Sequence, residues 1–293
     1  MAAHELPLER GTLHGHFSRE LPPALTIDPG DSIRFPTLDG RWGLGPPGPG
    51  EKRFEPRDPE LDAGHALLGP VEVRGARAGQ TLEVRIDEVR VGAWGATPAG
   101  EPALIWALDA DAGTGLDAAG RKVELSPFLG VLGMPPPEPG IHSTIPPRRW
   151  GGNLDCKELV AGSILYLPVP VDGALFSAGD GHARQGDGEV GGVAIECPLE
   201  HVQLTLGLRD DLPLDLPIAR TADAWITFGL DESLDRAADS ALEGMLDLMG
   251  RELGLDRHDA LALASVVVDL RVTQIVNGVR GVHAVLRDDA IRI

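Results

Sequence analysis

Much of the first two-thirds of the chain alternates apolar and polar residues, as strands with one buried face do. In residues 81–91 (TLEVRIDEVRV), leucine, valine and isoleucine alternate with charged residues. Residues 163–171 form a short apolar run broken by prolines, which predicts a buried strand that ends at a sheet edge. Residues 191–199 and 201–208 have the same character, and we expect them to form a further pair of strands.

A helical pattern replaces this alternation after about residue 231. Apolar residues then recur at three- and four-residue spacing, at Leu234, Ala238, Ala241, Leu242, Met245, Leu246 and Met249. This stripe predicts an amphipathic helix, with Ser233 as its N-cap and Gly254 just beyond its end. A second helix is expected over residues 259–267, followed by the strand-like runs VTQIV and VHAVL.

The chain is therefore expected to be mainly β, with a smaller α/β element and helices near the C-terminus. We divide it into an N-terminal β part (1–140), a central β part (141–225) that carries GGNLD and GDGHARQGDGE, and a C-terminal α/β part (226–293). Residues 37–60 and 133–149 are rich in proline and predict long irregular segments. Loops of this length inside a compact domain are usually functional.

Composition narrows the range of partners and compartments. The 293 residues include 45 Asp and Glu but only 26 Lys and Arg, a net charge of −19, which disfavours nucleic acid and anionic membrane surfaces. No apolar run is long enough for a spanning helix, and the first residues do not have the pattern of a secretory signal. With only two cysteines, a reducing cytoplasm is the expected location.

Reactive side chains are concentrated in residues 179–189, where four glycines separate three carboxylates, a histidine and a glutamine. Carboxylates crowded in this way repel one another unless a cation lies among them. In an extended chain Asp180 and His182 point to one side, as do Asn153 and Asp155. If the two pairs lie on neighbouring strands, they would form a mixed oxygen and nitrogen site suited to Zn²⁺ or a similar ion. The alternative is a polar hairpin with solvated acids.

Residues 151–196 resemble the acetamidase/formamidase family, from GGNLDCKELV to GGVAIE. Residues 64–86 (GHALLGPVEVRGARAGQTLEVRI) and 265–286 (SVVVDLRVTQIVNGVRGVHAVL) are similar to two further blocks of that family. The resemblance implies a metal-dependent hydrolase of small linear amides that releases ammonia and a short carboxylate. It also implies a mostly β fold with sandwich and barrel-like parts, assembled as a homodimer or higher homo-oligomer.

This resemblance and the local chemistry together assign the site residues. Asp180, His182 and Asp155 are the expected metal ligands, and His65 matches the family histidine as a ligand or acid–base group. The expected ion is Zn²⁺, with Ca²⁺ as a possible addition.

The base that deprotonates the attacking water is expected to be Glu196 or Glu189. We favour Glu196 because it lies in the apolar run VAIEC, where burial raises the pKa of a carboxylate. Asn153, Gln185 and His142 are the candidate substrate-binding residues, the first two through the amide carbonyl or by orienting the ligands.

Two alternatives remain open, and a third, covalent one is disfavoured. Cys156, Lys157 and Glu158 contain the residue types of a covalent amidase, but consecutive residues on a strand point to opposite faces and cannot converge on one carbonyl. A non-catalytic β-sandwich could bind a ligand or Ca²⁺ through the same acidic loop. An amidase of the same fold could act on a larger amide, because residues 37–60 match the family poorly.

Overall fold

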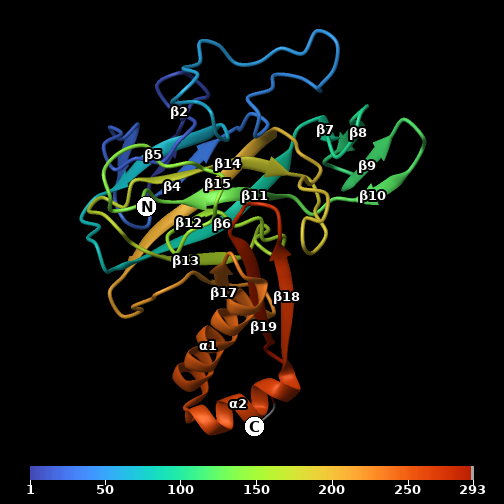
Figure 1. Cartoon of the computed structure of the whole chain (residues 1–293). Helices are drawn as coiled ribbons and strands as arrows, with labels where there is room; N and C mark the ends of the chain where they lie inside the picture. The colour runs from blue at the N-terminus through green and yellow to red at the C-terminus, as the bar shows by residue number, and fades with distance from the viewer. Residues whose placement is uncertain (292–293) are drawn as a thin grey trace.

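The computed structural model describes residues 1–291 and shows three β-sheets, with two helices near the C-terminus (Figure 1). The largest sheet has nine strands in the spatial order β1 (Ala3–Glu5), β4 (Ser32–Phe35), β15 (Leu199–Arg209), β6 (Thr81–Val91), β13 (Ile164–Pro168), β16 (Ile218–Arg220), β17 (Ala224–Asp231), β19 (Arg280–Arg287) and β18 (Val268–Gln274). The six-stranded sheet has the order β12 (Gly151–Asn153), β11 (Phe128–Gly133), β14 (Phe176–His182), β5 (Leu67–Val73) and β2 (Leu13–His14), and β3 (Leu25–Ile27) also pairs with β5. The smallest sheet has the order β10 (Lys122–Glu124), β9 (Thr114–Asp117), β8 (Leu104–Asp109) and β7 (Trp94–Thr97).

The mainly β architecture expected from the sequence is confirmed, although none of the sheets formed by residues 1–291 closes on itself. β6 has the predicted bounds, and its residues Leu82, Val84 and Ile86 are buried. They belong to one hydrophobic cluster with Val71 of β5 and Phe176 of β14, so the faces of the two larger sheets pack on each other. The largest sheet takes strands from all three parts into which we divided the chain, and the boundaries between these parts stay a prediction.

One predicted strand is wrong. Residues 191–198 form no strand, and β15 begins only at Leu199. Glu196 instead makes isolated bridges with Ala96 on one side and His182 on the other. The apolar residues 191–198 therefore bridge two sheets through Glu196 without forming a strand. The alternation of apolar and polar residues alone could not show this.

The irregular character predicted for two segments is confirmed. No helix or strand occurs within residues 37–60, and none occurs between the end of β11 and the start of β12. The first of these segments is nevertheless not a free surface loop. Residues 37–40 are buried, and Trp42 is only 1% exposed.

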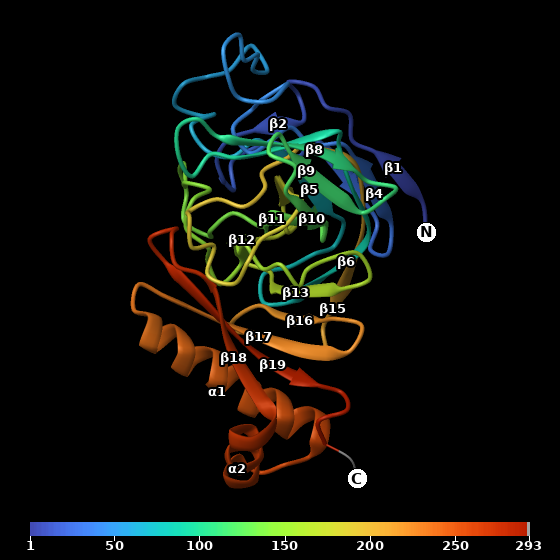
Figure 2. The same cartoon turned by 90° about the vertical axis from the view of Figure 1, so that its right-hand side faces the viewer.

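The C-terminal helices have the predicted order and caps. α1 (Leu234–Leu253) begins after the N-cap Ser233 and ends at Gly254, whose φ of 69° only glycine adopts at no steric cost. α2 (Arg257–Val267) follows, and α1 packs on β17 and β19 at the base of the molecule (Figure 2). None of the helices in residues 1–291 is both long and apolar enough to cross a membrane.

The contact between α1 and β17 depends on a glycine in the strand, Gly229. A Cβ atom at Gly229 of β17 would lie 1.9 Å from the carbonyl oxygen of Ala237 and 2.5 Å from the amide nitrogen of Ala241. Both atoms belong to the helix backbone, which cannot move aside as a flexible side chain can. The absence of a side chain at this position therefore sets how closely the helix approaches the sheet.

We expect Gly229→Ala to lower the free energy of unfolding by about 1–3 kcal/mol, because the added methyl group forces the helix away from the sheet. The matched control is Gly244→Ala in α1, where the added Cβ would lie 3.4 Å from the Cβ of Thr227. Alanine favours a helix by up to about 1 kcal/mol over glycine, so this control should be neutral or stabilising. Urea unfolding of both variants measures the difference, and equal midpoints would contradict the close-packing argument.

Candidate active site

Three strands of the six-stranded sheet carry the acidic cluster. Asp155 follows β12 by two residues, whereas Asp180 and His182 lie on β14. The two pairs do not lie on neighbouring strands, the arrangement considered from the sequence, because β11 separates β12 from β14. The side chains must therefore meet across the middle strand.

Gly130 of β11 makes this meeting possible. A Cβ atom at this position would lie 2.6 Å from Asp180 Oδ2, 2.7 Å from Asp155 Oδ1 and 2.9 Å from His182 Cε1. Asp155, Asp180 and His182 each offer one ligand atom, and these atoms all lie within 4.8 Å of one another. All three residues are buried, so the space above Gly130 is a small polar cradle of the kind that holds a metal ion.

The backbone at the site is held in a conformation that non-glycine residues rarely adopt. Asp155 has a φ of 49°, Asp180 of 61° and Glu189 of 45°, all in the left-handed region. Each such residue costs about 1–3 kcal/mol and persists only where the surrounding structure determines it. Strain at three acids of one site is typical of a functional cluster.

His182 is the basic side chain at the centre of this cluster. Its Nε2 lies 3.1 Å from Glu196 Oε2 and 3.5 Å from Asp180 Oδ2, and its Nδ1 lies 3.8 Å from Asp155 Oδ1. Within the described residues, His182 Nδ1 and Asp155 Oδ1 are buried and have no hydrogen-bond partner. Two buried, unpaired atoms of this kind fit a bound cation, which would satisfy both.

The pKa values report the same excess of negative charge. Burial alone would lower the pKa of His182, but the carboxylates of Glu196 and Asp180 outweigh it and raise this pKa well above its usual value. Burial, followed by the charge of Glu189, raises the pKa of Asp155 well above normal. Four carboxylates thus surround one imidazole, so a divalent ion fits the charge of the site as well as its shape.

The two candidate bases differ in their surroundings. Burial raises the pKa of Glu196, but the charge of His182 reverses the effect and leaves the pKa below its ordinary value, so the expected rise is wrong. Its Oε1 also accepts a hydrogen bond of 2.9 Å from the amide of Ala194. Burial raises the pKa of Glu189 to about 7, and its buried Oε2 has no hydrogen-bond partner in the part of the chain described.

Asn153 and Gln185, which the sequence suggested as substrate-binding residues, lie beside the cluster. The Nε2 atom of Gln185 donates a 2.7 Å hydrogen bond to the backbone oxygen of Asp155. Gln185 Oε1 and Asn153 Oδ1 remain buried without a partner among residues 1–291. The groups left free are therefore acceptors, which suit the N–H groups of an amide better than its carbonyl.

The C-terminal part supplies a site residue that sequence analysis missed. Asn277 Nδ2 donates a 2.6 Å hydrogen bond to Asp155 Oδ2, and Gln274 Oε1 accepts from the backbone amide of Asn277 and so holds this turn. The Asn277–Gly278 pair directly after a strand is a turn signal, but nothing local indicates where the turn docks. Gly130 was also missed, although a glycine inside the apolar strand FLGVLG signals a close approach.

The remaining histidines differ in their relation to the cluster. His65 Nε2 lies 4.0 Å from Asp180 Oδ2, and its Nδ1 is 2.8 Å from Thr144 Oγ1, so His65 borders the site. His142 Nε2 is 3.0 Å from the backbone oxygen of Glu138, and its backbone pairs with Phe17. None of the polar contacts of His142 within residues 1–291 reaches the cluster, so its role in binding stays a prediction.

Two further features of the structure, the surroundings of Cys156 and a cavity beside α1, also hold polar groups. Cys156 is fully buried with its Sγ 3.4 Å from Glu158 Oε2, and burial and that carboxylate raise the pKa of the thiol well above normal. Such a thiol is a poor nucleophile. Glu158 also faces His283 at 3.5 Å and Lys157 at 2.7 Å, so the four residues form a partly buried polar network.

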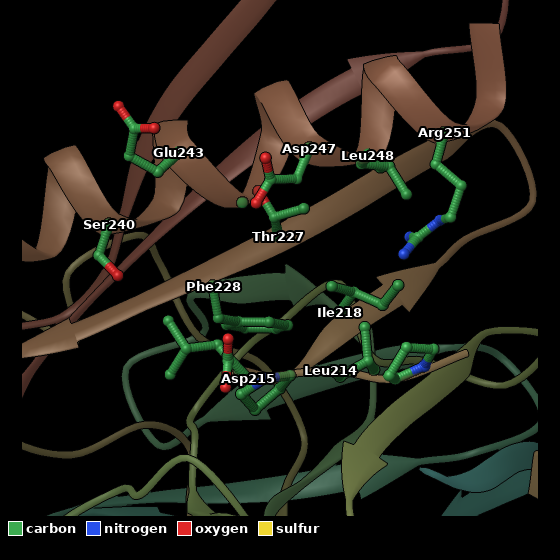
Figure 3. A pocket seen from close by; sticks show the side chains of 14 residues that line it. Leu214, Asp215, Ile218, Thr227, Phe228, Ser240, Glu243, Asp247, Leu248 and Arg251 are labelled. Carbon is green, nitrogen blue, oxygen red and sulfur yellow. The ribbon is translucent and has the colours of Figure 1, made fainter. Parts of the chain in front are cut away.

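A cavity of about 290 Å³ lies between α1 and β17 (Figure 3). Ser240, Glu243 and Asp247 line it from the helix, and Thr227 and Phe228 line it from the strand (Figure 3). No histidine, cysteine or lysine belongs to its lining in the described part of the chain. None of the buried side-chain atoms that lack a hydrogen-bond partner in residues 1–291 belongs to this lining, whereas Asp155, His182 and Glu189 of the acidic cluster each carry one, so the acidic cluster is the candidate active site.

Comparison with known proteins shows similarity to amidases. A formamidase of Methylophilus methylotrophus is 26% identical over 250 residues, which are 61% of this chain and 60% of that protein, so the chain spans less than two-thirds of this relative. The acetamidase of Bacillus halodurans has a similar structure, with 29% identity, a TM-score of 0.83 and 97% of each chain covered. A predicted acetamidase/formamidase of Thermoanaerobacter tengcongensis reaches a TM-score of 0.85 at 27% identity, over 98% of this chain and 97% of that one.

The family model for acetamidases and formamidases matches residues 3–139 and 138–286, which is nearly the whole chain. The match includes the strands β11, β12 and β14 that build the cradle, and also the turn that carries Asn277. The chain belongs to the acetamidase/formamidase family.

Proposed function

We propose that this protein hydrolyses small linear amides such as formamide or acetamide to ammonia and a carboxylate, with a divalent ion held by Asp155, Asp180 and His182. The observation that carries the proposal is the convergence of these three buried side chains over Gly130. Zn²⁺ is the first candidate, because two carboxylates and one imidazole are among its usual ligands. When bound, the ion would polarise the amide carbonyl and acidify a water molecule.

Residues around the ligands hold them in place. Glu196 faces Nε2 of His182 and so fixes the imidazole ring with Nδ1 turned toward Asp155. Asn277 and Gln185 hold the carboxylate and the backbone of Asp155, respectively. Residues that hydrogen-bond to metal ligands orient them, and their loss lowers metal affinity or activity by roughly 10- to 100-fold.

Glu189 is the residue we assign as the general base, in place of Glu196. Its buried Oε2 has no hydrogen-bond partner within residues 1–291, whereas both oxygens of Glu196 face partners. Glu189 would take a proton from the attacking water and pass it to the leaving nitrogen. The free oxygens of Asn153 and Gln185 would accept the two N–H groups of an unsubstituted amide, which orients its carbonyl carbon toward the water.

Chelation tests this function directly. We expect dialysis against a chelator to abolish ammonia release from formamide, acetamide and longer linear amides, and added Zn²⁺ to restore it. Elemental analysis of the same samples links activity to metal content. Full activity in metal-free protein would refute the metal-dependent mechanism, and metal binding without ammonia release from any amide would indicate a non-catalytic binding protein.

Gly130→Ala tests the cradle itself. The added methyl group would occupy the space between Asp155 and Asp180, so we expect loss of bound metal and of ammonia release with the overall fold retained. The matched control is Gly207→Ala in β15, where the new Cβ would lie 3.6 Å from the Cβ of Glu83, an ordinary contact. Normal metal content and turnover in Gly130→Ala would place the catalytic centre elsewhere.

Substitution of each glutamate separates the base from the positioning residue. Glu189→Gln should keep its metal but lose about 10²- to 10⁴-fold in turnover, because glutamine has a similar shape but cannot take the proton. Glu196→Gln should instead weaken metal binding by about 10- to 100-fold, because His182 loses the charge that orients it. Metal content and initial rates of ammonia release measure both effects. The assignment fails if Glu189→Gln turns over normally while Glu196→Gln keeps its metal and is inactive.

A further inference from the structure

A second cavity, of about 240 Å³, opens beside the acidic cluster and carries the opposite charge. Arg41, Arg53 and Arg57 line it together with Trp42 and His65. We propose that this pocket, which we call the arginine pocket, binds a carboxylate on the substrate, so that the amide hydrolysed is the monoamide of a dicarboxylic acid. This inference rests on the proposed function and names the substrate class of the same site.

The arginine pocket and the cluster share a wall. Gly40 lines the pocket, and a Cβ atom on it would lie 2.1 Å from Asp180 Oδ1 and 3.3 Å from His65 Cδ2. His65 also lines the pocket, and its Nε2 lies 4.0 Å from Asp180 Oδ2. The pocket and Asp180 are thus separated only by Gly40 and His65, and the inference places the amide of a short substrate at the cluster with its other end past these two residues in the pocket.

The charge of the pocket is unusual for this chain, in which acids outnumber bases by 45 to 26. Asp62 is the acid among the described residues that line the pocket, and it is already paired with Arg10 at 2.9 Å. Arg53 pairs with Glu51 at 3.0 Å, and Asp39 and Glu55 lie near Arg41 and Arg57, but these three acids lie outside the lining. The described lining itself therefore holds three guanidinium groups and one carboxylate.

Two of these guanidinium groups have unused donors. Arg41 Nε and Nη2 and Arg57 Nε are buried and make no hydrogen bond within residues 1–291. Their nearest acids are too distant for one, since Asp39 lies 3.6 Å from Arg41 Nη2 and Glu55 lies 3.8 Å from Arg57 Nε. Buried donors normally find acceptors, and a carboxylate matches the fork of a guanidinium with two parallel hydrogen bonds.

Packing keeps Arg57 in position before a ligand arrives. The guanidinium of Arg57 lies 5.8 Å from the ring centroid of Trp42, within the range of a cation–π contact. Trp42 is itself fixed, because it is 1% exposed and its Nε1 donates a 2.9 Å hydrogen bond to the backbone oxygen of Gly64. A preorganised arginine loses less side-chain entropy when it binds an anion.

The test compares succinamic acid with butyramide, a neutral amide of equal carbon number. We expect kcat/KM for succinamic acid to exceed that for butyramide by at least about tenfold, because one hydrogen bond to a charged group stabilises a complex by about that factor. Arg41→Gln and Arg57→Gln should each lower this ratio by about ten- to a hundredfold. Arg57→Lys, which keeps the charge but not the planar fork, should have an intermediate ratio.

The matched control is Arg74→Gln, because Arg74 is 59% exposed, pairs with Asp28 and lies outside the arginine pocket. This control should leave the ratio unchanged, and thermal unfolding of every variant confirms that it is folded. Equal kcat/KM values for the two amides in the wild-type protein, or a ratio unaffected by both arginine-to-glutamine changes, would overturn the inference while the proposed function stands.

If no amide releases ammonia, the proposed function fails and the substrate class fails with it. Calorimetric titration with succinate then decides whether the pocket binds anions. Binding that is lost in Arg57→Gln but retained in Arg74→Gln would keep the anion site, and no binding to the wild-type protein would overturn it.

Discussion

Buried negative charge is the constraint on which the rest of the site depends. Asp155, Asp180, Glu189 and Glu196 gather around the single imidazole of His182, away from water. Ionised carboxylates in such surroundings cost several kcal/mol each unless a cation compensates them. A bound divalent ion would allow all of them to be charged at neutral pH, and its binding energy would offset the strained backbone at Asp155 and Asp180.

Space for such an ion exists because two glycines lack a side chain, and neighbouring residues hold the proposed ligands. Gly130 leaves the cradle open on one side, and Gly40 leaves room for Asp180 on another, because a Cβ atom at either would overlap the aspartate. Asn277 then reaches from the turn between β18 and β19 to hold Asp155. The C-terminal α/β part thus contributes a contact to the candidate active site as well as adding to the β body.

The charge of the whole chain and that of the arginine pocket act over different distances. Salt screens charges that lie more than a Debye length apart, so the net charge of −19 repels distant anions only weakly. A negative net charge also gives anions no long-range attraction toward the protein. Recognition of an anionic substrate must therefore come from short contacts with arginines whose donors are unused. Residues 37–60 supply these arginines, so a segment without regular structure would set which amides the cluster receives.

Local patterns in the sequence determined the strands and helices, whereas the geometry of the acidic cluster depends on how these elements pack. The alternation in β6, the stripe of α1 and the caps Ser233 and Gly254 are properties of neighbouring residues, so they could be predicted. Asp180 and His182 were also recognisable, because their spacing on a strand places them on one side. The sequence could not predict that β11 lies between β12 and β14. It also could not predict the hydrogen bond from Asn277 to Asp155, which are 122 positions apart in the chain. Strand order and the docking of a turn depend on contacts between residues far apart in the chain, which leave no periodic signal along it.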